Sequence, residues 1–172
     1  MSEERVIYFT INEEVEKYFD DSSIPGSGPP EFVLLCGGVC SGKTTIRKQK
    51  YSHGYVLIDA AEIFLSLSRG EYYDFGAAFE EPLELIGREV ARKAVSERRN
   101  IVTEMICGSQ ENIEAVIGAM KTVGYKIDIV YVQCDIQEAW KRNLERGDDN
   151  ISAHYTEPYH QRWILKAAAE QS

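Results

Sequence analysis

The sequence lacks the marks of several protein classes. No apolar run is long enough to span a membrane and no signal peptide is recognisable at the N-terminus, which predicts a cytoplasmic protein that does not act at a membrane. The cysteines form no Cys-x-x-Cys pair, so neither a zinc site nor a disulfide framework is expected. Basic residues number 19 against 28 acidic ones. This balance argues against a nucleic-acid partner, because affinity for the nucleic-acid backbone comes from Lys and Arg.

The sequence does contain one strong motif, the phosphate-loop pattern Gly-x-x-x-x-Gly-Lys-Ser/Thr, which follows an apolar run and precedes a predicted helix. The backbone N–H groups of such a loop wrap a polyphosphate, and glycines let the chain approach it closely. The positive end of the helix dipole adds to the attraction. The predicted nucleotide-binding residues are Gly37, Gly38, Val39, Cys40, Ser41, Gly42, Lys43, Thr44 and Thr45.

Two side chains of this loop have separate expected roles. Lys43 is expected to reach the β- and γ-phosphates of a nucleotide. The hydroxyl of Thr44 is the predicted protein ligand of a Mg²⁺ ion, whose other positions are filled by waters and phosphate oxygens. A nucleoside triphosphate and Mg²⁺ are therefore the expected cofactors.

The pattern of apolar segments predicts the fold. Strands are expected at 32–36, 55–58, 101–104 and 126–134. They alternate with expected helices at 43–50, 62–67, 82–100 and 109–124, and further helices are expected from 135 through 144 and from 158. This alternation predicts an α/β protein with the three-layer P-loop NTPase fold, in which helices flank a mostly parallel central sheet. The segment 32–36 is continuously apolar and is expected to be buried, whereas 126–134 alternates and is expected to be less buried. Pro82 is expected in a first helical turn.

The chain is expected to divide at residue 30. Residues 1–30 are predicted to be an N-terminal helical segment and linker, appended to the core rather than part of it, and residues 31–172 hold the phosphate loop and its domain. A capping box that starts at Thr10 predicts a short helix, with Val15, Tyr18 and Phe19 on its apolar side. Proline and glycine between residues 24 and 30 predict the linker.

Polar residues follow the predicted strands. In parallel sheets, ligands bind beyond the carboxyl ends of the strands. That rule places Gly37, Asp59, Glu104 and Asp135 on one rim, so the carboxylates are expected to face the phosphate loop.

Two arginines help to narrow the class of enzyme. The sequence has neither the Asp-x-x-Gly nor the Asn-Lys-x-Asp motif of a GTPase. It does have Arg142 and Arg146, one helical turn apart, and such arginines stabilise the charge of a phosphoryl group during transfer in the lid of a small kinase. The alternative is an exposed helix face on which Glu138 and Arg142 form an ordinary ion pair.

The order of these motifs resembles that of the zeta toxin family kinases, and the resemblance covers roughly residues 32–165. The motifs are the phosphate loop, Val56-Leu57-Ile58-Asp59, Asn100-Ile101-Val102-Thr103-Glu104, Gly124-Tyr125 and the arginine-bearing helix. The resemblance implies an ATP-dependent kinase that phosphorylates a hydroxyl of a small molecule. That molecule is UDP-N-acetylglucosamine in the bacterial toxins, and an antitoxin protein is the implied partner.

The resemblance also implies roles for single residues. Lys43 matches the lysine that stabilises the phosphates and Thr44 matches the Mg²⁺ ligand. Glu104 matches a glutamate on the substrate side or near the metal, and Arg142 with Arg146 covers the first lid arginine.

Two positions depart from the family pattern. Members commonly have Asp-x-Asp after the second strand, and the second Asp is the base toward the substrate hydroxyl, but this chain has Ala61 there. Either Asp59, which would also contact the substrate, or Glu62 after a one-residue slip would have to act as the base. Further on, His154 stands where members carry another lid arginine, and a histidine is a weaker clamp because it is only partly charged near neutral pH.

Two alternatives to a sugar-nucleotide kinase remain open. One is a nucleotide-binding module that has lost turnover and acts through protein association, which Ala61 and His154 motivate. The other is a 5′-hydroxyl polynucleotide kinase, which the acidic charge disfavours. Acceptor contacts are expected from the aromatic and glycine-rich segment at residues 69–80.

Overall fold

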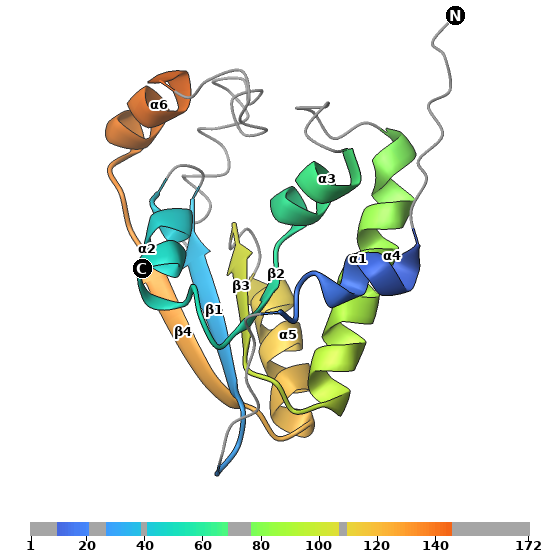
Figure 1. Cartoon of the computed structure of the whole chain (residues 1–172). Helices are drawn as coiled ribbons and strands as arrows, with labels where there is room; N and C mark the ends of the chain where they lie inside the picture. Colours follow the sequence, from blue (N-terminus) through green and yellow to red (C-terminus); the bar gives the residue numbers. More distant parts are fainter. Residues whose placement is uncertain (1–9, 21–26, 39–40, 69–76, 107–109, 146–172) are drawn as a thin grey trace, which may run out of the picture.

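A computed structural model describes residues 10–20, 27–38, 41–68, 77–106 and 110–145 (Figure 1). Its elements are α1 (Ile11–Glu16), β1 (Glu31–Gly37), α2 (Lys43–Lys50), β2 (Val56–Ile58), α3 (Ala60–Ser68), α4 (Ala77–Ser96), β3 (Ile101–Met105), α5 (Gln110–Thr122), β4 (Lys126–Val132) and α6 (Ile136–Glu145). The four strands form one sheet in the order β2-β3-β1-β4, and every pair is parallel. The alternation of strands and helices and the parallel sheet are as predicted.

Strand β1 lies in the interior of the sheet, between β3 and β4. In its register Leu35 pairs with Glu104 of β3 and with Val130 of β4. From Phe32 to Gly37 every residue of β1 is buried, as its continuous apolar run predicted. The outer strand β4 is less buried, which confirms the expectation from its alternating pattern.

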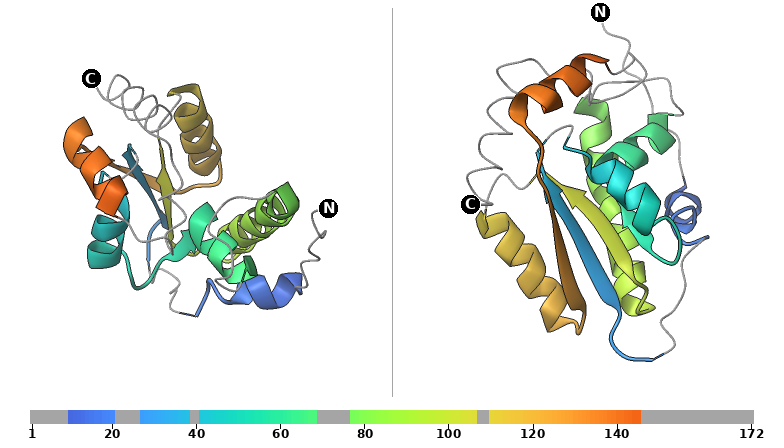
Figure 2. Two further views of the ribbon diagram at one scale, coloured as in Figure 1. Left: turned by 90° about the horizontal axis from the view of Figure 1, so that it is seen from above. Right: turned by 90° about the vertical axis from the view of Figure 1, so that its left-hand side faces the viewer.

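The side chains of β1 alternate between two apolar layers. On one face Leu34 and Cys36 join a core formed with α1, α3, α4 and α5. On the other face Val33 and Leu35 pack with Val102, Val132 and the Ile46 side chain of α2. Seen from above, α2 lies on one side of the sheet and α4 and α5 lie on the other, which gives the three layers (Figure 2). Glu104 has the same parity along β3 as Val102, so it faces the α2 layer.

Helix α1 packs into the core, contrary to the expectation of an appended segment. Its Val15 is buried, and so is Phe19 in the turn that follows the helix, both in the same cluster as β1 and α4. The carboxylate of Glu14 is also buried, and it accepts hydrogen bonds from Lys17 at 2.6 Å and from Ser66 of α3 at 2.8 Å. The boundary at residue 30 stays a prediction, but the helix before it contributes to the fold.

Several element ends differ from the predicted ones. The long helix begins at Ala77, so Pro82 lies inside α4 rather than in a first turn. A proline there removes one backbone hydrogen bond, a loss that the apolar face of the helix offsets by packing Ile86, Val90 and Ala94 into the core. Helix α1 follows Thr10, whose side chain makes no capping hydrogen bond, so the predicted capping box is wrong.

The structure also describes the state of two cysteines. Cys36 is disulfide-bonded, although the spacing of the cysteines led us to expect no disulfide framework. Cys134 is free. The segment at residues 69–76 and all residues after Glu145, His154 among them, lie outside the described part of the chain. None of the helices that the structure describes is long and apolar enough to cross a membrane.

Candidate active site

The phosphate loop joins the end of β1 to the start of α2. Gly42 precedes α2 with a φ of +105°, a left-handed conformation that glycine adopts without strain. Lys43, Thr44 and Thr45 then form the first turn of the helix, so their backbone N–H groups are available to a phosphate. Val39 and Cys40, which belong to the predicted loop, lie outside the described residues.

Gly37 is a position where a side chain has no room. A Cβ there would lie 2.5 Å from the carbonyl oxygen of Val132 and 2.5 Å from the hydroxyl of Ser41. The glycine at the end of β1 is therefore required by the close approach of β4 and of the loop itself.

Lys43 points back into the loop. Its Nζ donates hydrogen bonds to the carbonyl oxygens of Gly37 and Gly38, both at 2.7 Å. The ammonium group thus lies inside the turn that the motif assigns to a polyphosphate. A phosphate oxygen that enters the loop could accept the Lys43 N–H hydrogen bonds that these two carbonyl oxygens now accept.

Glu104 of β3 connects this strand to α2, the helix that follows the phosphate loop. The Thr44 hydroxyl donates to Glu104 Oε1 at 2.8 Å, and Arg47 Nε donates to Glu104 Oε2 at 2.6 Å. The Glu104 side chain is 8% exposed, so its charge is held by these two partners rather than by water. The predicted placement of Glu104 beside the phosphate loop is what the structure has.

Arg47 lies at the centre of the cluster and was not predicted from the sequence. Its guanidinium is buried, pairs with Glu104, and reaches Glu62 of α3 with 3.7 Å between Nη2 and Oε1. A signal for it existed, because Thr44 and Arg47 are three residues apart and share a helix face. The structure therefore gathers Thr44, Arg47, Glu62 and Glu104 from α2, α3 and β3.

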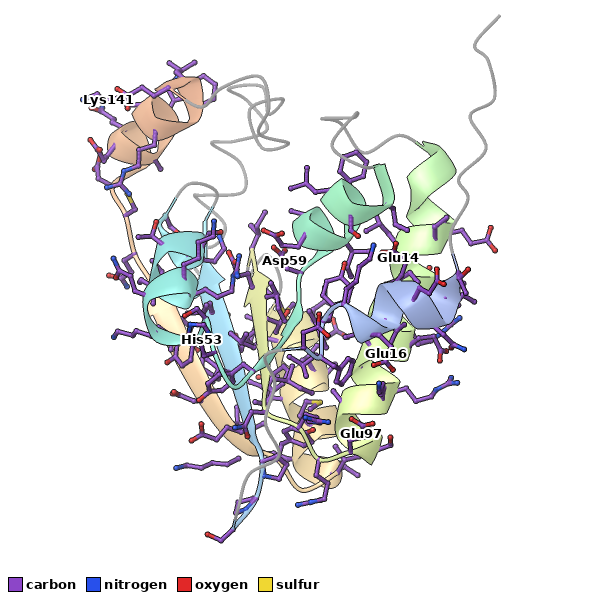
Figure 3. The ribbon with its side chains drawn as sticks, viewed as in Figure 1. Glu14, Glu16, His53, Asp59, Glu97 and Lys141 are labelled. Carbon is purple, nitrogen blue, oxygen red and sulfur yellow. The ribbon has the colours of Figure 1, made fainter. Side chains whose placement is uncertain are left out.

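Asp59 follows β2 and directly precedes α3, at the end of the sheet that carries the loop (Figure 3). Its Oδ1 accepts the backbone N–H of Ala61 at 3.4 Å. Burial raises the pKa of Asp59 to about 6, and the Glu104 carboxylate adds to the rise, while Arg47 and the Ala61 N–H lower the pKa. A carboxylate with such a pKa changes its protonation state close to neutral pH.

Of the two arginines expected in a lid, the described residues contain one. Arg142 lies exposed on α6, where its Nε donates to Glu138 at 3.2 Å and its Nη1 donates to the Cys134 sulfur at 3.5 Å. This is the ion pair that the alternative interpretation expected. Arg146 lies outside the described residues.

Asp135 does not join the site. Its Oδ1 accepts the backbone N–H groups of Gln137 and Glu138 at 3.0 and 3.1 Å, so it caps α6. The predicted rim thus divides into Gly37, Asp59 and Glu104 at the loop and Asp135 in a structural role.

The donor set of the loop fits Mg²⁺. No group of three or more His, Cys, Asp and Glu side chains in the described ranges could hold a metal by itself. Beside a nucleotide, however, Mg²⁺ needs only one or two protein oxygens, because phosphates and waters supply the rest. The hydroxyl of Thr44 and the carboxylate of Glu104 are hard oxygen donors that lie together at the start of α2.

A comparison with protein families identifies the chain. The zeta toxin family model matches residues 15–171. The chain belongs to the zeta toxin family. Members of this family are kinases, so the protein is an ATP-dependent phosphotransferase with a P-loop. A search of curated proteins gave no significant match.

Three solved structures illustrate the proteins that share this fold. A protein of the PezAT chromosomal toxin-antitoxin system of Streptococcus pneumoniae is 18% identical with a TM-score of 0.69, over 96% of this chain and 72% of that chain. AvrRxo1-ORF1:-ORF2 with ATP is 15% identical with a TM-score of 0.66, over 94% and 52%. The Pnkp1/Rnl/Hen1 RNA repair complex is 13% identical with a TM-score of 0.61, over 87% and 48%. At these identities the likeness shows the fold alone, and it confirms the predicted P-loop kinase architecture of this zeta toxin family member.

Proposed function

We propose that this zeta toxin family protein transfers the γ-phosphoryl group of ATP to a hydroxyl of a small molecule of the sugar-nucleotide class, such as UDP-N-acetylglucosamine. The observation that carries the proposal is the contact between the Thr44 hydroxyl and the Glu104 carboxylate at 2.8 Å. It joins the phosphate loop to a carboxylate of the strand beside β1, and Asp59 lies close enough for Glu104 to raise its pKa.

Each residue of the site has a separate role in the phosphoryl transfer. Lys43 exchanges its two carbonyl partners for phosphate oxygens and offsets their charge. Asp59 accepts the proton of the acceptor hydroxyl, whose oxygen forms a bond to the γ-phosphorus as the bond to the β,γ-bridging oxygen breaks and ADP leaves. The Thr44 hydroxyl would hold Mg²⁺, with Glu104 directly behind that hydroxyl, and the ion would supply charge neutralisation to the phosphates.

Asp59 suits the role of base better than Glu62. Glu62 is engaged in an ion pair with the buried Arg47, with 3.7 Å between Nη2 and Oε1. Asp59 has a pKa of about 6, which allows it to be ionised at neutral pH and still take up a proton. Ala61, at the family's usual base position, packs against the apolar core.

The arginine proposed to bind the transferred phosphoryl group from the lid is Arg142 of α6. Arg142 would leave the exposed Glu138 and the partly exposed Cys134, which water replaces at low cost, and would pair with the transferred phosphoryl group. Arg146, one turn further along the sequence, is proposed to assist it.

The test follows labelled γ-phosphate from ATP in the presence of Mg²⁺ to a panel of acceptors. The panel holds UDP-N-acetylglucosamine, other sugar nucleotides, dinucleotides and a 5′-hydroxyl oligonucleotide. Transfer to a sugar nucleotide, lost in Lys43→Ala and retained in Lys48→Ala on the exposed side of α2, is the expected result. Transfer to the oligonucleotide alone, or full activity of Lys43→Ala, would reject the proposal.

A second candidate is a nucleotide-binding protein without turnover, which acts through a protein partner. Ala61 and the paired state of Arg142 favour it. Tight ATP binding with no transfer to any acceptor would support it. In either case the proposed partner is an antitoxin protein, by analogy with the PezAT toxin-antitoxin system. Co-expression of a neighbouring gene product and its co-purification with the chain would test this partner.

A further inference from the structure

Arg47 is the only buried Lys or Arg within the described ranges, and its partners are all groups of the proposed active site. Its Nε occupies one oxygen of Glu104 at 2.6 Å, and its Nη2 lies 3.7 Å from Glu62. The side chain is 8% exposed, so the pair with Glu104 is shielded from water and more rigid than a surface ion pair.

The direction of the hydrogen bonds indicates that Arg47 does more than balance the charge of Glu104. Arg47 takes Glu104 Oε2, which leaves Oε1 to accept the hydrogen of the Thr44 hydroxyl. A hydroxyl whose hydrogen is engaged has its lone pairs turned away from that acceptor. Thr44 is exposed at the start of α2, so those lone pairs are open to a cation in the phosphate loop.

We propose that Arg47 is a positioning residue, which fixes Glu104 so that Glu104 orients the Thr44 hydroxyl toward the magnesium ion of a bound nucleotide. The inference rests on the proposed nucleotide site. Outer partners of metal ligands typically change metal affinity by roughly 10- to 100-fold when they are removed. The pair with Glu62 extends the same arrangement to α3, the helix that begins after Asp59.

The test measures ADP binding by calorimetry in excess Mg²⁺ and in EDTA, for the full-length wild type and for Arg47→Met, Arg47→Lys and Lys48→Met. The ratio of the two affinities reports the contribution of the metal. We expect this ratio to fall roughly 10- to 100-fold in Arg47→Met. Arg47→Lys should keep part of it, because an ammonium retains the charge without the fixed geometry of the guanidinium. Lys48→Met, an exposed neighbour on α2, should match the wild type.

A purely structural role for Arg47 predicts a different pattern, in which ADP affinity falls equally with and without Mg²⁺ and the ratio is unchanged. That outcome would overturn the inference while leaving the proposed function intact. If the wild type shows no Mg²⁺-dependent ADP binding, both fail.

If Arg47→Met does not fold, the double variant Arg47→Met with Glu104→Gln removes the buried unpaired carboxylate. We expect the double variant to bind Mg²⁺-ADP no more weakly than Glu104→Gln alone, since Arg47 acts through Glu104. A further tenfold loss of the ratio in the double variant would contradict this.

Discussion

Replacing Asp59 by Asn should raise the stability of the protein and abolish its kinase activity. The pKa of Asp59 is raised to about 6 because burial and the nearby Glu104 carboxylate disfavour its charge. The ionised side chain therefore destabilises the folded state at neutral pH. Asparagine has nearly the same shape and is an equally good residue before a helix, so α3 keeps its start at Ala60.

The size of the effect follows from the pKa. A rise from 3.8 to about 6 corresponds to about 3 kcal/mol, since each unit of pKa is worth about 1.4 kcal/mol. In a chain of this length, that free energy corresponds to an increase in Tm on the order of 6 to 12 °C. The sign is that of a carboxyl group whose pKa is higher in the folded than in the unfolded state. Its stabilising protonated form is complete below about pH 4 and is lost as the pH rises through about 6.

The assay is thermal unfolding of wild type and Asp59→Asn, without nucleotide or Mg²⁺, at a series of pH values from 4 to 8. The difference in Tm should be near zero at pH 4 and reach its full size by about pH 7. Asp20→Asn, at an exposed position after α1, is the isosteric control. A Tm of Asp59→Asn at pH 7 that equals or falls below that of the wild type would refute the reasoning. Loss of at least 100-fold in kcat is expected if Asp59 is the base.

Three further predictions concern single positions. Gly37→Ala should weaken nucleotide binding and destabilise the fold by about 1–3 kcal/mol, because its Cβ would lie 2.5 Å from a carbonyl oxygen of β4. Gly118→Ala on α5, where the Cβ has open space, should be neutral or stabilising in denaturant titrations. Phe19→Ala should lower the unfolding free energy by about 3–5 kcal/mol, since the ring is 7% exposed, and Ile11→Ala, 40% exposed, should cost less than 1 kcal/mol. Ala61→Asp should lower Tm without raising kcat; a rate gain would place the base at that position.

The strands, their parallel direction and the end of the sheet that holds the site were predictable because each depends on short-range patterns. A fully buried strand such as β1 has a continuous apolar run, and the glycines and lysine of the phosphate loop form a local motif. The sheet order β2-β3-β1-β4 was not predicted, because it depends on crossovers between distant segments. That order is what puts Glu104 beside the loop rather than one strand away.

What the sequence did not reveal depends on tertiary contacts. An arginine in a short helix ordinarily faces water. The spacing from Thr44 puts Arg47 on the helix face of the site, but the sequence does not indicate that carboxylates from β3 and α3 surround it. The start of α4 was also missed, because Pro82 is more typical of a first turn than of a helix interior. Likewise the short α1 was expected to stand apart, although Val15 and Phe19 complete the core beside α4.

The position of the base can be argued from the same contacts. A carboxylate at residue 61 would lie against the apolar core, where Ala61 packs, and would lack the partners that Asp59 has. Phosphoryl transfer has a loose transition state, in which the acceptor proton leaves late and most of the stabilisation comes from positive charge. Moving the base two residues earlier, from position 61 to Asp59, therefore lowers the rate less than the loss of a cation would. Lys43 in the loop and Arg47 behind Glu104 retain that positive charge. The missing aspartate is thus compatible with a working kinase, provided that Asp59 can be ionised beside Glu104.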